Sequence, residues 1–114
     1  MKKFIVIFMT PAAVLAKWAA TDPAEREAAQ SKMKGEWDAW MATHKNSILE
    51  IAGLGATKRI TPDGTTDTKN DMMMYALMQA ESQDAVAAMF VGHVHLQIPE
   101  ATIEVMEAKS LLEN

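Results

Sequence analysis

The sequence predicts an α+β fold in a single domain, with four strands, two helices and a break in the first helix. One observation is the order of the elements, which reads strand, helix, strand, strand, helix, strand. The other is that the first and third strands are apolar throughout, whereas the second and fourth carry charges. Continuous apolar strands are typical of the centre of a sheet, and charged strands of its edges. A chain of 114 residues is long enough to bury one core.

The first strand is predicted at Lys3–Met9. Its basic start and apolar run also resemble a secretory signal peptide. However, Thr10 and Pro11 are favoured at the cap and first position of a helix, so a helix over Pro11–Ala20 begins inside the supposed signal. Trp18 also lies where a cleavage site requires small residues. We therefore expect an uncleaved strand and a cytoplasmic protein.

The helix breaks and restarts at the stretch TDPAE. Asp22 is a good N-cap, Pro23 suits the first helical position, and Glu25 fits a capping box. From there to about Lys45 the chain is amphipathic, with an apolar stripe at helical spacing. The stripe consists of Met33, Trp37, Trp40 and Met41.

The second strand is predicted at Ala56–Ile60. The preceding segment Ile48–Ala52, which ends in GLG, is interpreted as a connector. The TPDG stretch that follows the predicted strand is typical of a β-turn, and Thr65–Asp71 is predicted to be a polar loop.

The third strand is predicted from Met72 to Met78, and the last strand at Ala101–Glu107. Between them, Ser82 caps the second helix and Gly92 ends it. This β-α-β-β-α-β order is the ferredoxin-like pattern, a four-stranded antiparallel sheet with both helices on one face. Because the central strands are apolar on both sides, the bare face predicts a homodimer that packs sheet against sheet.

Composition excludes several functions. The chain has no cysteine, which excludes disulfides, zinc–thiolate sites and thiol catalysis. Its net charge is -4 and it lacks a basic cluster, so we do not expect a nucleic-acid partner. No run approaches the roughly 20 apolar residues of a membrane span, and no membrane partner is expected. The GLGATK stretch precedes a strand rather than a helix, so it is not a phosphate-binding loop. No cofactor is expected.

Four stretches together cover most of the chain: MKKFIVIFMTPAA, EWDAWMATH, GLGATKRITPDGTTD and GHVHLQIPEATIEVMEAKS. They resemble the YCII-related family, and in particular its longer members with an insertion in the first helical region. The last stretch is the most specific, being similar to a G-[HC]-P-H-L…IEV segment of the family. The resemblance implies a ferredoxin-like subunit in a homodimeric α/β barrel. It also implies that enzymatic relatives act on small organic acids, including chlorinated muconolactones, as lyase-type dehalogenases.

The candidate site residues begin with His93 and His95, a pair spaced for a common direction in an extended segment. Such a pair can contribute to a metal site or act as a general acid or base, and His95 is the candidate catalytic residue. Alternatively, both imidazoles cap the helix end and bond loop carbonyls. No further metal ligands are evident, and no metal is expected.

Candidate ligand-binding residues are His93, Tyr75, Trp37 and Trp40. Trp37 and Trp40 could stack on a ring-shaped ligand, although aromatic residues at helical spacing more often pack in the core. Tyr75 would be a polar point in an apolar central strand. The sequence thus leaves three functions open: a binding protein for a small organic molecule, a non-catalytic dimeric interaction or regulatory module, and a lyase or dehalogenase acting on small organic acids or lactones.

Overall fold

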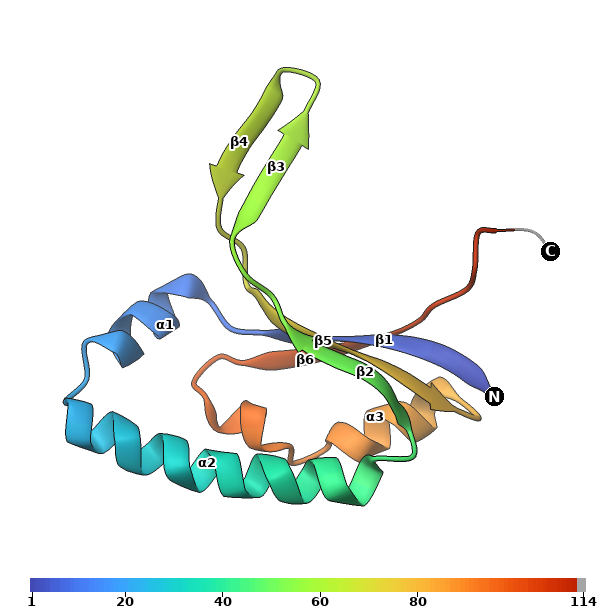
Figure 1. Ribbon diagram of the computed structural model, residues 1–114, viewed down its shortest axis with the longest axis horizontal. Helices are drawn as coiled ribbons and strands as arrows, with labels where there is room; N and C mark the ends of the chain where they lie inside the picture. Colours follow the sequence, from blue (N-terminus) through green and yellow to red (C-terminus); the bar gives the residue numbers. More distant parts are fainter. Residues whose placement is uncertain (113–114) are drawn as a thin grey trace.

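The computed structural model describes residues 1–112 and contains a four-stranded antiparallel sheet. Its strands are β1 (Lys2–Met9), β2 (Ile48–Gly53), β5 (Met72–Ala80) and β6 (Thr102–Glu107), in the spatial order β2-β5-β1-β6 (Figure 1). This is the ferredoxin-like arrangement, which confirms the predicted fold class and the central place of the first and third strands. The sheet is open, with β2 and β6 at its edges, so no barrel closes among residues 1–112.

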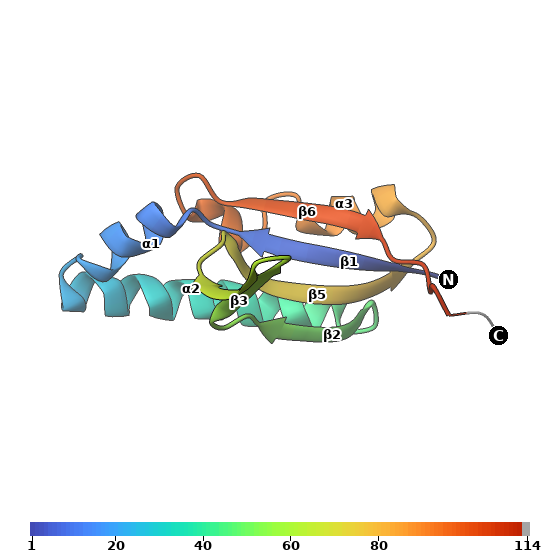
Figure 2. The same cartoon turned by 90° about the horizontal axis from the view of Figure 1, so that it is seen from above.

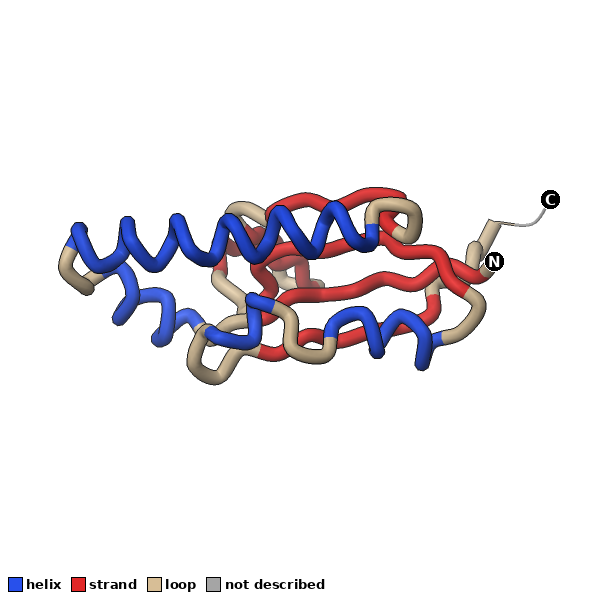
Figure 3. Tube along the Cα trace, turned by 90° about the horizontal axis from the view of Figure 1, so that it is seen from below, coloured by secondary structure: helices blue, strands red, loops and turns tan. Residues whose placement is uncertain are grey.

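The helices lie on one face of this sheet (Figure 3). They are α1 (Ala12–Ala19), α2 (Pro23–His44), α3 (Gln83–Phe90) and the 3₁₀ turn η1 (Val94–Gln97). The break between α1 and α2 is as predicted, because the Asp22 carboxylate accepts hydrogen bonds from the Ala24 and Glu25 amides at 3.1 and 3.3 Å. Within residues 1–112, no helix combines the length and the apolar character needed to cross a membrane.

The predicted second strand was wrong. The strand that pairs with β5 is Ile48–Gly53, the segment interpreted as a connector. Its register shifts between Ile48 and Glu50, and such a bulge disrupts the two-residue alternation by which a strand is recognised in sequence. As a result Ile48 and Ile51, three positions apart, both pack against the core.

The residues predicted as the second strand form half of a separate hairpin. Here β3 (Thr57–Thr61) pairs with β4 (Gly64–Thr68) around the predicted TPDG turn, where Gly64 has φ 130°. The loop predicted over Thr65–Asp71 is therefore largely strand. We call Thr57–Thr68 the arm; Figure 1 shows it projecting away from the sheet and helices.

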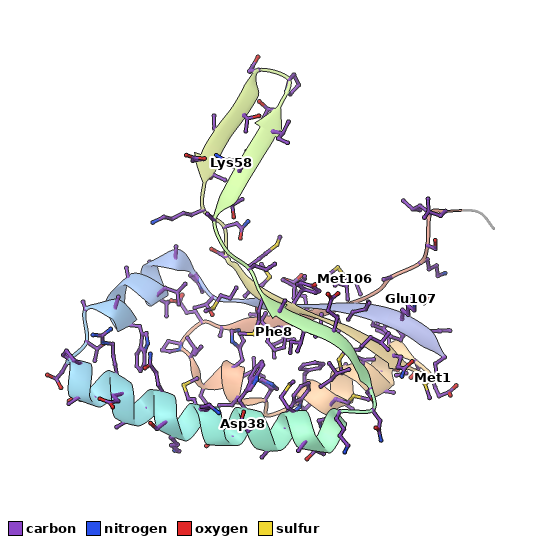
Figure 4. All side chains as sticks on the ribbon, viewed as in Figure 1. Met1, Phe8, Asp38, Lys58, Met106 and Glu107 are labelled. Atoms are coloured by element: carbon purple, nitrogen blue, oxygen red, sulfur yellow. The ribbon has the colours of Figure 1, made fainter. Side chains whose placement is uncertain are left out.

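The core lies between the sheet and the helices. Alternate residues of β1, namely Phe4, Val6 and Phe8, are fully buried there, and Phe8 appears between the two layers in Figure 4. They pack with Val86 and Phe90 of α3. The opposite side of the sheet, which we call the open face, carries no helix from the described part of the chain. Its residues on the two central strands, identified by the strand register, are Ile5, Ile7, Tyr75 and Leu77, with Glu50, Glu104 and Met106 on the edge strands.

Candidate functional site

A cleft of about 810 Å³ opens between α1, the N-terminal half of α2 and the loop that follows η1. Both helices extend beyond the end of the sheet at this point (Figures 1 and 3). Its apolar lining includes Leu15, Trp18, Met33, Trp37, Met73 and Ile98. A volume of this size is in the range of small-molecule sites.

Local interactions shape the cleft from both ends. The Asp22 cap starts α2 immediately after the turn from α1, where the Thr21 hydroxyl donates to the Lys17 carbonyl at 3.1 Å. At the other side, the Gln97 side-chain amide donates to the Glu36 carboxylate at 2.6 Å. This second hydrogen bond links the loop after η1 to α2, so two walls of the cleft are joined by a side-chain contact as well as by the backbone.

Glu100 occupies an unusual position on the cleft wall. Its φ of 61° lies in the left-handed region, where it is the one non-glycine residue within the described part of the chain. Side chains with a Cβ are uncommon there, and such backbone strain collects at functional sites. Glu100 is also the one carboxylate among the cleft's lining residues in the described range, whereas Lys17, Lys32 and Lys34 are the bases.

An aromatic cluster adjoins the cleft and surrounds His93. The His93 ring centroid lies 5.0 Å from that of Trp37, 4.7 Å from Trp40 and 5.5 Å from Phe8. Trp37 belongs to both groups, since it lines the cleft and meets His93 nearly edge to face at 87°. The indole of Trp40 is fixed from its far side by a 2.8 Å bond to the Met89 carbonyl.

His93 is a buried, neutral imidazole. Burial, followed by the neighbouring charges of His95 and His44, lowers the pKa of His93 from 6.5 to about 4. Its Nδ1 accepts the His95 backbone N–H at 3.0 Å, so the proton of the neutral ring resides on Nε2. That Nε2 is buried and has no hydrogen-bond partner within residues 1–112, and its ring contacts the indoles of Trp37 and Trp40.

His95 is held by the backbone rather than presented to the cleft. Its Nε2 lies 3.0 Å from the Met9 carbonyl, and because a carbonyl only accepts, Nε2 carries the proton. Burial lowers the pKa of His95, while backbone hydrogen bonds to Met9 and Thr102 oppose that shift. Its ring packs edge-on against Phe8 at 5.4 Å. This arrangement differs in detail from the capping alternative that the sequence left open, because the carbonyl belongs to β1 rather than to a loop and the imidazole of His95 caps no helix.

The structure brings together some of the candidate residues and separates others. His93, Trp37 and Trp40 form one cluster, and His95 adjoins it through Phe8. Tyr75 does not join them, because it pairs with Ile7 on the open face, on the other side of the sheet. There Glu50 raises the pKa of Tyr75, first through a side-chain hydrogen bond.

The histidine pair does not occupy an extended segment. His93 is the N-cap of η1 and His95 lies within that turn, so the alternation expected of a strand does not apply. Across residues 1–112, no group of three or more His, Asp or Glu side chains could hold a metal ion.

Sequence reasoning missed most of the cleft. Trp18, Met33, Ile98 and Glu100 line it, yet none was a candidate. One signal was available: Trp18 lies on a short helix that is apolar at every position except Lys17, and such a helix requires a surface to cover. No local pattern in the sequence indicated how α1 is oriented relative to α2.

Comparisons with known proteins do not assign the chain to a family. No family model matches it, and no curated protein matches it. The YCII-related resemblance therefore stays a prediction.

Several solved structures show weak likeness. A 5-chloro-2-hydroxyhydroquinone dehydrochlorinase (TftG) from Burkholderia phenoliruptrix, in complex with 2,5-dihydroxybenzoquinone, matches with 17% identity over 91% of each chain and a TM-score of 0.46. A protein of unknown function from Galdieria sulphuraria matches with 9% identity over 98% of this chain and 47% of its own, with a TM-score of 0.35. A hydantoinase/carbamoylase family amidase from Burkholderia ambifaria has 17% identity over 95% and 27%, with a TM-score of 0.37.

Proposed function

We propose that the protein binds a small organic molecule with an apolar ring in the cleft between α1 and α2. The observation that carries this proposal is the cleft itself, about 810 Å³ in volume and walled by two of the chain's three tryptophans, Trp18 and Trp37. Indole surfaces provide large, rigid contact areas for a ring. The lysines around the cleft favour a ligand that also carries an acidic group.

Tryptophan fluorescence tests the proposal directly. A panel of ring-bearing acids and matched neutral rings is titrated into the protein, and saturable quenching with a rise in the melting temperature is expected for the acids. Trp18→Ala should abolish most of the response, because this ring lines the cleft. Trp40→Phe is the matched control, since Trp40 packs on Phe90 rather than in the cleft. Equal responses from both variants would place the ligand elsewhere.

The lyase-type alternative would require a titratable group at the ligand. Neither histidine lines the cleft, whereas Glu100 does and has a strained backbone. Glu100 is therefore our candidate base in place of His95 for any proton abstraction there. A turnover assay with an organic acid that binds would test it: Glu100→Gln should remove turnover and leave binding within a few-fold, whereas His95→Gln should retain turnover.

We further propose that the protein is a homodimer whose subunits meet through the open face. Ile5 lies opposite Leu77 and Met106, and Ile7 lies opposite Tyr75, so the middle of this face is apolar. Met106 on this face, for example, is 44% exposed in the single chain. An apolar sheet face is the usual site of sheet-on-sheet packing. Leu77→Glu should convert the dimer to a monomer in analytical ultracentrifugation, whereas Val91→Glu, at an exposed position after α3 on the helix side, should not.

A dimer without ligand chemistry is the second candidate function, favoured by the open face alone. Experiments distinguish the ligand-binding protein from the interaction module. A dimer that binds no member of the ligand panel supports an interaction module, and cleft binding in the Leu77→Glu monomer supports a site independent of the dimer.

A further inference from the structure

The arm, Thr57–Thr68, has little support from the rest of the described chain: the side chain of Asn70 donates to the Thr57 hydroxyl at the base of the arm, at 3.3 Å. Its two strands form a sheet of their own, closed by the Lys58–Asp67 ion pair at 2.7 Å. Ile60, in the middle of β3, is 81% exposed. An isolated two-stranded hairpin is marginally stable in water. A polar arm with an exposed isoleucine is therefore a feature that a partner would stabilise.

The direction of the arm indicates where that partner lies. Figure 1 shows the helices on one side of the sheet and the arm rising on the other, the side of the open face. Figure 2 looks onto that side and shows the arm nearly end-on. A molecule seated on the open face would therefore have the arm alongside it.

We propose that the arm is a clasp, which packs against the flank of a second copy of this chain seated on the open face. This inference rests on the homodimer proposed above and adds the element that secures it. In a two-fold dimer each copy supplies one open face and one arm, so the contact occurs twice.

The length of the arm fits this role. Each arm strand has five residues, which corresponds to about 17 Å at 3.3–3.4 Å per residue. Two sheets that pack face to face lie only about 10 Å apart. The outer part of the arm therefore extends past the plane of the partner's sheet and contacts its flank.

The open face alone is smaller than a stable dimer interface, and the arm supplies further contact area. Four strands of about six residues form a patch of roughly 20 by 20 Å, so two such faces bury about 800 Å² in total. Stable, specific interfaces bury about 1,200–2,000 Å², whereas an area of about 800 Å² or less is typical of crystal contacts. Two arms, each about 17 by 10 Å and each covering an equal area of the partner, bring the total to about 1,500 Å².

One cation of the arm is complementary in charge to the acidic groups of the open face, although the arm also carries Asp63 at its turn. Arg59 on the arm forms no ion pair within residues 1–112, and the same holds for Glu50 and Glu104 at the edges of the open face. A second copy places an unpaired guanidinium beside an acidic sheet edge, whereas a nucleic acid would be repelled by those carboxylates. Ile60 and Arg59, adjacent along β3, point to opposite faces of the arm and offer an apolar and a charged contact.

The test removes the arm from the intact protein. Residues 57–68 are replaced by Asn-Gly, a two-residue turn that can join the strand ends because Thr57 and Thr68 are paired neighbours. Analytical ultracentrifugation should show a dimer dissociation constant about a hundredfold higher than that of the wild type. Far-UV circular dichroism and the cleft's ligand response verify that the armless chain remains folded.

Single substitutions identify the face of the arm in contact. Ile60→Glu and Arg59→Glu lie on opposite faces, and at least one should raise the dissociation constant about tenfold. Val91→Glu is the matched control, since Val91 is 83% exposed on the helix side and should leave the constant unchanged. A wild-type monomer would overturn both the homodimer and the clasp. A wild-type dimer that dissociates no more readily without its arm would overturn the clasp alone.

Discussion

Trp37 and His93 meet nearly edge to face, with ring centroids 5.0 Å apart and ring planes at 87°. The indole is also part of the cleft wall, whereas the imidazole is 3% exposed and lies inside the aromatic cluster. One side chain thus connects the candidate binding site to a buried titratable group. Ligand binding at Trp37 is therefore expected to change the environment of His93, and a change at His93 is expected to alter ligand binding.

The two cleft tryptophans should separate ligand binding from stability. Trp37 packs against the core, so Trp37→Ala is expected to lower the free energy of unfolding by about 2 kcal/mol. Trp18 is 36% exposed, and Trp18→Ala should cost less than about 1 kcal/mol. Both variants should weaken ligand binding. Urea denaturation and fluorescence titration on the same samples provide the comparison, and a Trp18 variant with normal binding would contradict the site.

Stability should fall as the pH drops below 6.5, because the unfolded His93 binds a proton that the folded side chain resists. With a folded pKa of about 4, this loss develops between pH 6.5 and 4 and is on the order of 3 kcal/mol. His93→Asn should flatten that part of the profile, since asparagine retains a cap for η1 without titrating. Denaturant unfolding at a series of pH values measures it; an unchanged slope in His93→Asn would assign the dependence to other groups.

His95→Ala should destabilise the fold, because it removes the imidazole donor from the half-buried Met9 carbonyl and opens a cavity beside Phe8. The expected loss is about 2–3 kcal/mol. His95→Gln, which keeps a donor, should recover part of it. If instead His95→Ala unfolds normally and fails to bind ligand or turn it over, the catalytic role expected from the sequence would stand.

Loss of the Asp22 cap should affect the cleft, whereas loss of an equivalent cap elsewhere should not. Asp22→Ala and Ser82→Ala each remove a side chain that accepts from the first turn of a helix, and each should cost about 1 kcal/mol. Of these two helices, only α2, which Asp22 caps, borders the cleft. Only Asp22→Ala should therefore weaken ligand binding. Equal binding losses in the two variants would indicate a general effect of destabilisation.

Glu100→Gly should stabilise the protein by about 1 kcal/mol, because glycine adopts the φ of 61° without a steric penalty. Glu100→Ala keeps the Cβ and should bring no such gain. Thermal unfolding of the two variants decides the matter. A glycine variant that is less stable than the alanine variant would show that this backbone conformation carries no strain.

The caps of α2 and α3 and the centre of the sheet were predictable from sequence, whereas the predicted start of the first helix was wrong: α1 begins at Ala12 with Pro11 at its N-cap and no side-chain cap, not at Pro11 under a Thr10 cap. Asp22, Ser82 and Gly92 act through the backbone groups next to them, so their capping roles follow from their neighbours alone. The central strands were also recognisable, since a strand between two others in a sheet tends to be apolar on both faces. These signals are local, and the structure confirmed each of them.

The sequence alone predicts the alternation of strands and helices around the four-stranded sheet and its two central strands, because caps, turns and apolar runs act over a few residues. Only the tertiary structure decided that Ile48–Gly53, with its bulge, is the edge strand and that the polar Thr57–Thr68 leaves the sheet as an arm. It also decided that Tyr75 faces away from His95, and that Trp18 and Glu100, 82 positions apart, line one cleft. Pairing register and the angle between α1 and α2 depend on contacts between distant segments, and no local pattern encodes them.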